Sequence, residues 1–216
     1  MKNELTKRII TSLFLIGLLI FAFYFVYILI ISLIIISLIS WIEFNALFSK
    51  IFKKKKFFNL VLRATSLIYL VFFSIHIFNA MTDPVVKNYA IYIFCICIFS
   101  DIGGLTFGKF FGGKKLTKIS PNKTRSGSIG SFIFSLLLMP FFINFFEYSL
   151  DLFPFIILTL ITSFACQLGD LFISYLKRKA KVKDTGDLLP GHGGVLDRID
   201  GMLLAVPIAL ILFRYF

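Results

Sequence analysis

The feature that most constrains the fold of this chain is an apolar run from Ile9 to Ile42 that carries no charged residue. At a rise of 1.5 Å per residue, one helix over these ~34 residues would be about 51 Å long, whereas the hydrocarbon core of a bilayer is about 30 Å thick. One straight helix is therefore too long for a single crossing. The run predicts two membrane-spanning helices that meet near residues 21–27, where no glycine or proline marks a turn.

Five further apolar segments predict five more spans. They lie near residues 57–78, 88–107, 128–146, 152–173 and 201–213. The composition agrees, because 58% of the 216 residues are hydrophobic, whereas soluble domains are about 45–50% apolar. We therefore predict an all-α polytopic transmembrane protein with about seven spans.

The distribution of basic residues predicts the orientation of these spans. The net charge is +12, and 20 of the 23 lysines and arginines lie in four segments that are separated by pairs of predicted spans. Cytoplasmic loops carry an excess of such residues, so these segments, the N-terminus included, are predicted to be cytoplasmic. Their placement favours anionic lipid and phosphate over nucleic acid as partners. Arg63 is an exception, because it lies inside a predicted span.

The polar loops divide the chain into two parts. Residues 1–100 hold about four N-terminal transmembrane helices, of which the fourth ends near residue 107. Residues 101–216 hold three spans and two long loops, 108–127 and 174–200, which the topology places on the cytoplasmic side. Because both loops are rich in glycine and lysine, we predict that the second part is the catalytic half.

The first loop contains residues suited to binding phosphate. Glycine lets backbone N–H groups approach an anion, and lysine supplies charge. Ser120, Lys123 and Thr124 form a compact set of donors of this kind, although a solvated basic loop has a similar composition. The segment Gly108–Lys115 fails the P-loop pattern at its last position and follows a membrane helix, so we reject a P-loop.

Three aspartates at the ends of predicted spans form a candidate metal site. Asp170 closes the sixth span, and Asp197 and Asp200 lie three residues apart before the seventh. A helix from Leu196 onward places the last two on one face, and carboxylate and phosphate oxygens are the ligands that Mg²⁺ prefers. A carboxylate that ends an apolar run is costly unless paired, so Asp101 is a candidate too, with an interfacial contact to water as the alternative.

The second loop surrounds this candidate site with charge. Four basic side chains there are suited to neutralising phosphate: Lys177, Arg178, Lys183 and Arg198. Gly193 and Gly194 would let the backbone approach a phosphate. His192 is too isolated for a zinc site, and we interpret it as a phosphate hydrogen-bond donor, with a turn-stabilising residue or a proton carrier as alternatives. Together these residues predict a membrane enzyme that acts on phosphates with a divalent cation.

The second loop also carries a longer pattern. The segment SYLKRKAKVKDTGDLLPGHGGVLDRID, from Ser174 to Asp200, resembles the signature of the phosphatidate cytidylyltransferases, also called CDP-diacylglycerol synthases. The segments DIGGLTFGKFFGGKKL, ISPNKTRSG and QLGDLFISYLKR are similar to that family as well. Two departures are Ser126, where the family usually has glutamate, and Gly104–Leu105, where it has Ala-Tyr. The resemblance covers the chain well from Asp101 onward.

The resemblance implies a reaction and a location. The expected reaction is transfer of a cytidylyl group from CTP to phosphatidic acid, which gives CDP-diacylglycerol and pyrophosphate and depends on Mg²⁺, with a second cation as an option. The expected location is the inner cell membrane, with the active-site loops facing the cytoplasm, and a homodimer is implied. The alternatives are a related CTP-dependent polyprenol or lipid kinase and a non-enzymatic transporter, although transporters usually place ionisable groups near the membrane midplane.

The resemblance also assigns roles to residues. It implies metal binding by Asp170 and Asp197, with Asp200 in support. It places Asp184 where it would orient a lysine or the metal shell, and Ser174 where it would bind substrate. The basic side chains named above become phosphate-neutralising candidates, with Lys183 and Arg198 among the catalytic residues.

Overall fold

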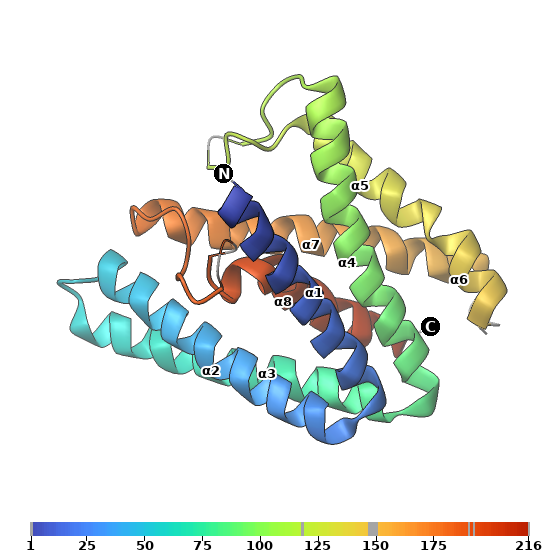
Figure 1. Ribbon diagram of the computed structural model, residues 1–216, viewed down its shortest axis with the longest axis horizontal. Helices are drawn as coiled ribbons and strands as arrows, with labels where there is room; N and C mark the ends of the chain where they lie inside the picture. The colour runs from blue at the N-terminus through green and yellow to red at the C-terminus, as the bar shows by residue number, and fades with distance from the viewer. Residues whose placement is uncertain (1, 118, 147–150, 190, 192, 216) are drawn as a thin grey trace. The chain divides into compact units, whose positions relative to one another are not determined.

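The computed structural model describes residues 2–117, 119–146, 151–189, 191 and 193–215, and the regular elements in that part of the chain are α-helices (Figure 1). They are α1 (Lys2–Tyr24), α2 (Val26–Ile51), α3 (Lys56–Thr82), α4 (Pro84–Phe111), α5 (Arg125–Leu137), α6 (Met139–Phe146), α7 (Leu152–Lys179) and α8 (Leu196–Phe213). Among the described residues, five helical segments are long and apolar enough to cross a membrane: α2, α3, α4, Arg125–Asn144 and α7. The chain is an all-α polytopic membrane protein.

The long apolar run divides at Phe25, inside the predicted turn region 21–27. Phe25 has an extended backbone, with φ −118° and ψ 109°, and separates α1 from α2. Its N–H still donates to the carbonyl oxygen of Phe21 at 2.9 Å, so the helix is interrupted at a single residue that is neither glycine nor proline. The division of this run into two helices is confirmed, whereas α2 alone of the two is long and apolar enough to cross a membrane, and the apolar part of α1, Leu13–Tyr24, is shorter.

Helices extend beyond the predicted spans into both predicted loops. α4 continues as far as Phe111 and α7 as far as Lys179. The predicted span 128–146 is divided between α5 and α6, where Pro140 has no N–H to continue the α5 hydrogen-bond pattern. The polar loops are therefore shorter than predicted, and Ser174, Lys177 and Arg178 lie on a helix.

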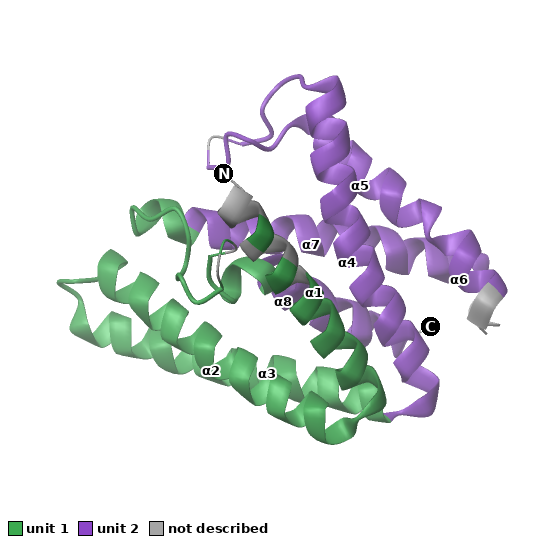
Figure 2. Cartoon of the chain, in the orientation of Figure 1, with its two compact units in different colours: residues 1–82, 176–199 green, residues 83–175, 200–216 purple. Residues whose placement is uncertain are grey.

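The chain forms two compact units that interleave along the sequence (Figure 2). Unit 1 comprises residues 1–82 and 176–199, and unit 2 comprises residues 83–175 and 200–216. The first boundary between the units lies between α3 and α4, and the other two fall inside α7 and α8. The segment that carries the signature therefore contributes to both units.

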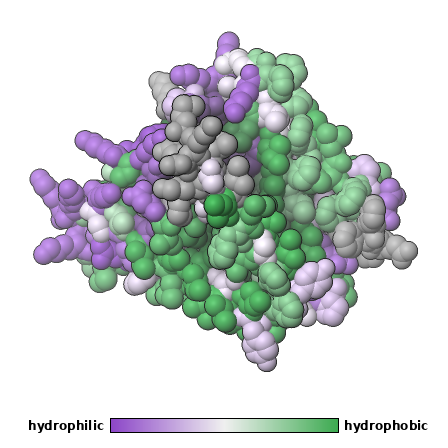
Figure 3. Space-filling model, viewed as in Figure 1, coloured by the Kyte–Doolittle hydropathy of each residue, from purple (hydrophilic) through white to green (hydrophobic). Residues whose placement is uncertain are grey.

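In unit 1, α2 and α3 form an antiparallel hairpin that polar bonds tie together (Figure 1). Trp41 Nε1 donates to the carbonyl oxygen of Arg63 at 3.1 Å. The Arg63 guanidinium donates to Ser49 Oγ at 2.6 Å and to Asn59 Oδ1 at 3.1 Å, which explains how an arginine is accommodated in this apolar segment. The turn between the helices and the first residue of α3 carry exposed lysines 53–56, and hydrophilic residues gather there in Figure 3.

In unit 2, α4 packs closely against α5 because glycines meet at the contact. A Cβ atom on Gly103 would clash with the carbonyl oxygen of Gly130, and one on Gly130 would clash with Phe107. Small residues of this kind let membrane helices approach closely. The core of the unit includes Tyr92, whose hydroxyl lies 2.6 Å from Thr159 Oγ1 and whose ring stacks on Phe155.

Candidate active site

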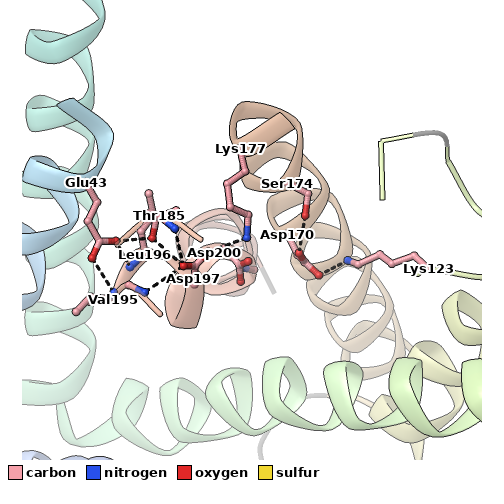
Figure 4. A network of polar contacts seen from close by, with 12 residues as sticks. Glu43, Lys123, Asp170, Ser174, Lys177, Thr185, Val195, Leu196, Asp197 and Asp200 are labelled. Carbon is pink, nitrogen blue, oxygen red and sulfur yellow. Dashed lines mark hydrogen bonds and ion pairs between the residues drawn. The ribbon is translucent and has the colours of Figure 1, made fainter. Parts of the chain in front are cut away.

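Asp197 is the centre of a hydrogen-bonded cluster in unit 1, which we call the Asp197 cluster: Lys177, Thr185, Gly194 and Asp197 (Figure 4). Its Oδ2 accepts from the Thr185 N–H at 2.8 Å, from the Thr185 hydroxyl at 2.9 Å and from the Gly194 N–H at 3.1 Å. Its Oδ1 accepts from Lys177 Nζ at 2.7 Å. The side chain of Asp197 is 6% exposed and that of Lys177 is 14% exposed. The loop and the end of α7 thus fix this carboxylate at the start of α8.

These donors also decide the charge of Asp197, which lies ahead of the predicted span 201–213. Burial by itself would raise the pKa of its carboxyl group. The Lys177 ammonium and the N–H groups of Thr185 and Gly194 outweigh burial and lower the pKa below its ordinary value. Asp197 is therefore held as an anion that is already paired with a cation.

Glu43 of α2 is a carboxylate that the sequence reasoning missed. It is 5% exposed and accepts from the Thr185 hydroxyl at 2.6 Å and from the N–H groups of Val195 and Leu196 at 2.9 and 2.8 Å. Figure 4 shows it pointing from α2 toward these residues. One signal in the sequence could have pointed to Glu43. It is the first charged residue after the long uncharged run, and a carboxylate at the end of an apolar segment is costly unless it is paired.

Two predicted glycines shape the loop around these carboxylates. Gly193 has φ +81°, a conformation that favours glycine, and a Cβ atom there would lie 3.1 Å from Asp197 Oδ2. A Cβ atom on Gly194 would clash with the Thr185 hydroxyl and with both carboxylate oxygens of Glu43. Glycine is thus required where the loop backbone approaches the acidic groups.

A second cluster lies in unit 2, which we call the Asp170 cluster: Lys123, Asp170 and Ser174 (Figure 4). Lys123 Nζ forms an ion pair with Asp170 Oδ2, and the two side chains are 28% and 24% exposed. The Ser174 hydroxyl donates to Asp170 Oδ1 at 3.3 Å from one helical turn further along α7. The structure therefore brings together three of the predicted site residues in this unit.

The loop that presents Lys123 is closed by backbone bonds. The Leu116 N–H donates to the carbonyl oxygen of Lys123 at 2.8 Å, and the Lys123 N–H donates to that of Ser120 at 3.1 Å. Thr124 is the N-cap of α5, and its hydroxyl accepts from the Gly127 N–H at 3.1 Å. Ser120 and Thr124 thus help to shape this loop, and their contact with phosphate stays a prediction.

The remaining predicted site residues lie outside the two clusters, and one of them lies outside the described residues. Four of them are exposed: Arg178, Lys183, Asp184 and Arg198. Asp200 Oδ1 accepts from the Gly201 N–H at 2.8 Å, and Asp101 Oδ1 lies 4.0 Å from Cys166 Sγ. His192 lies outside the described residues.

The carboxylates of the two clusters supply oxygen donors of the kind that Mg²⁺ prefers, and their named members include no sulfur ligand of the kind found in zinc sites. Within the described part of the chain, no group of three or more His, Cys, Asp or Glu side chains is placed to hold a metal ion. Mg²⁺ usually takes one or two carboxylates and completes its shell with water and substrate phosphates. The donor set fits that pattern, and the sharing of one ion by Asp170, Asp197 and Asp200 stays a prediction.

The fold and these clusters define a class: a polytopic membrane protein with lysine–carboxylate pairs and glycine-shaped loops suited to phosphate. A model of the cytidylyltransferase family matches residues 3–216. The chain belongs to the cytidylyltransferase family.

Curated relatives agree with this assignment. The chain is 41% identical over 126 residues to a phosphatidate cytidylyltransferase of Staphylococcus haemolyticus, which covers 58% of this chain and 48% of that protein. It is 42% identical over 126 residues to one of Staphylococcus aureus, with the same coverage, and 39% identical over 137 residues to one of Rickettsia bellii, covering 60% of this chain and 58% of that protein. The chain spans about half the length of the curated relatives it matches.

Proposed function

We propose that this protein transfers the cytidylyl group of CTP to phosphatidic acid and releases pyrophosphate, giving CDP-diacylglycerol on the cytoplasmic side of the inner cell membrane. The observation that carries the proposal is the Lys177–Asp197 pair, fixed by Thr185 and Gly194, within the segment that resembles the phosphatidate cytidylyltransferase signature. These relatives are phosphatidate cytidylyltransferases, which supports the choice of phosphatidate as acceptor.

The reaction joins a phosphate oxygen of phosphatidic acid to the α-phosphorus of CTP. The bond from that phosphorus to the oxygen that bridges the α- and β-phosphates breaks, and this oxygen leaves as a terminal oxygen of pyrophosphate. A phosphate monoester is largely ionised at neutral pH, so the acceptor oxygen needs no general base. Catalysis then consists mainly of positioning and charge neutralisation. This requirement fits a site made of lysines and carboxylates and explains why no nucleophile–base pair stands out in the sequence.

The residues of the chain would divide these tasks between them. Lys177 and Lys123 supply positive charge beside Asp197 and Asp170. Asp197 and Asp170 would hold Mg²⁺, which when bound neutralises charge on the phosphate oxygens of the substrates. The exposed basic groups Arg178, Lys183 and Arg198 would attract and orient CTP.

Labelled CTP tests this proposal against the lipid kinase alternative. The purified full chain in detergent micelles is supplied with phosphatidic acid, a polyprenol, Mg²⁺ and CTP that carries ³²P at either the α or the γ position. We expect α-label in the lipid product and γ-label in pyrophosphate. Transfer of γ-label to lipid would show a kinase instead, and absence of both labels from lipid would contradict the proposed activity.

A further inference from the structure

We propose that Glu43 is a positioning residue for this reaction, which fixes Asp197 in place from a helix far away in the sequence. The inference rests on the proposed function and adds to the same site a residue that lies outside the signature. Glu43 lies 142 residues from Thr185 and 153 residues from Leu196 along the chain. All of these residues belong to unit 1.

Glu43 uses both carboxylate oxygens to hold the start of α8. Oε1 accepts from the Val195 N–H at 2.9 Å, and Oε2 accepts from the Leu196 N–H at 2.8 Å. The first N–H groups of a helix have no partner within the helix, and negative charge is favourable at that end. Glu43 is thus a tertiary cap of α8, whose first residue, Leu196, directly precedes Asp197.

Thr185 joins the carboxylates of Glu43 and Asp197. Its hydroxyl oxygen lies 2.6 Å from Glu43 Oε2 and 2.9 Å from Asp197 Oδ2. A hydroxyl group has one proton to donate, so the two carboxylates share it, while the Thr185 N–H donates to Asp197 separately at 2.8 Å. Glu43 therefore reaches Asp197 by two routes, through the α8 backbone and through Thr185.

The loop backbone closes around Glu43. A Cβ atom on Gly186 would lie 2.9 Å from Glu43 Oε1, and one on Gly194 would clash with both of its oxygens. A buried carboxylate is costly unless it is hydrogen-bonded, and this carboxylate is 5% exposed and fully engaged by loop and helix donors. Loss of the acceptor oxygens would therefore release residues 185–189 and 193–197, which present Asp197.

Glu43→Gln is the variant that tests this role, because it keeps the size of the side chain and replaces one acceptor oxygen with an NH₂ donor. The matched control is Ser40→Ala, one turn earlier on α2. Ser40 is fully buried, and its Oγ has no hydrogen-bond partner among the described residues. We expect Glu43→Gln to lower kcat/KM for CDP-diacylglycerol formation about 10- to 100-fold, as the loss of hydrogen bonds to a charged group does, and Ser40→Ala to keep wild-type activity.

Hydrogen exchange supplies a readout that does not depend on activity. In the full chain in detergent micelles, Glu43→Gln should raise the exchange rate of amides in 185–197 about tenfold or more and leave α4 and α5 unchanged. Wild-type exchange in this segment, or an equal rise throughout the chain, would overturn the positioning role. If the wild-type protein forms no CDP-diacylglycerol, the proposed function fails, while the exchange rates still decide whether Glu43 holds the segment.

Thr185 gives an independent test of the route to Asp197. Thr185→Val removes the hydroxyl at nearly constant volume, and Thr185→Ser keeps it, so serine should recover most of the activity that valine loses. The effects of substitutions within one hydrogen-bond network are not additive. The activity of the double variant Glu43→Gln, Thr185→Val should therefore be no lower than that of the less active single variant. Losses that multiply would show that the two residues act independently and would overturn the proposal.

Discussion

The Asp197 cluster and the Asp170 cluster hold their carboxylates in different ways. Asp197 is 6% exposed, and two backbone N–H groups, a hydroxyl and Lys177 donate to it. Asp170 is 24% exposed and relies on the side chains of Lys123 and Ser174. Backbone donors are fixed by the fold, whereas a lysine ammonium on a flexible stem can move to a new partner. We infer that Asp197 is a permanent part of the site, while Asp170 can adjust when a substrate phosphate competes for its lysine.

The largest effect should come from Asp197→Asn. The amide cannot accept as a carboxylate does, and it leaves the 14%-exposed Lys177 without its anion; breaking a buried ion pair costs about 3–5 kcal/mol. We expect at least ~100-fold loss of CDP-diacylglycerol formation, together with a lower unfolding midpoint in detergent. Radiolabelled product and a thermal unfolding curve measure the two effects.

Asp170→Asn should separate the effect on activity from the effect on stability. We again expect at least ~100-fold loss of activity, but little change in the unfolding midpoint, since partly exposed ion pairs contribute only about 0–1 kcal/mol. An equal drop in midpoint for both variants would show that the clusters are equally rigid. Near-normal rates in both variants would remove the metal assignment altogether.

A smaller effect is expected at the glycine that the Asp197 cluster requires. Gly194→Ala places a methyl group against Thr185 and Glu43, and overpacking of this kind costs about 1–3 kcal/mol. We expect a lower unfolding midpoint and about tenfold lower activity. Gly17→Ala is the control, because a Cβ atom there meets nothing within 4 Å and alanine favours a helix; equal losses in both variants would contradict the role given to Gly194.

Substitutions of Lys177 and Lys123 should differ more in their effect on protein stability than in their effect on activity. Lys177→Met leaves Asp197 buried without its cation, so the unfolding midpoint should fall, whereas Lys123→Met should change the free energy of unfolding by less than about 1 kcal/mol. Unfolding curves at low and high salt check this, because salt screens exposed pairs more than buried ones. If salt weakened the contribution of the Lys177–Asp197 pair to stability as much as that of the Lys123–Asp170 pair, the two clusters would not differ in rigidity.

The sequence predicted those parts of the molecule that depend on local pattern. Hydrophobicity placed the helices and the break near Phe25, and the signature selected Lys177 and Asp197, which the structure joins. It did not predict Glu43, because its partners lie more than a hundred residues away and no local pattern marks them. It also ended the sixth span at residue 173, since the charged residues that follow look like a loop, although α7 continues to Lys179.

The first loop shows a second limit of sequence reasoning. Ser120, Lys123 and Thr124 were predicted together because all three can donate to phosphate. In the structure Lys123 pairs with Asp170, and the Thr124 hydroxyl caps α5. A side chain with several hydrogen-bonding options is assigned by the fold around it, and the sequence alone does not rank those options.

The smallest effect is expected at Ser126, where the family usually has glutamate. The Ser126 hydroxyl donates to the carbonyl oxygen of Gly112 and lies 2.9 Å from Thr124 Oγ1. Ser126→Glu loses the tie to Gly112 but adds a negative charge in the first turn of α5, which is worth about 0.3–1 kcal/mol, whereas Ser126→Ala loses the tie alone. The unfolding midpoint should therefore fall more for alanine than for glutamate, with activity within about threefold of wild type for both. A rise in activity of more than about tenfold for Ser126→Glu but not for Ser126→Ala would show that an acidic group at this position acts on the substrates. The comparison between a fixed Asp197 and an adjustable Asp170 would then have to include a third carboxylate.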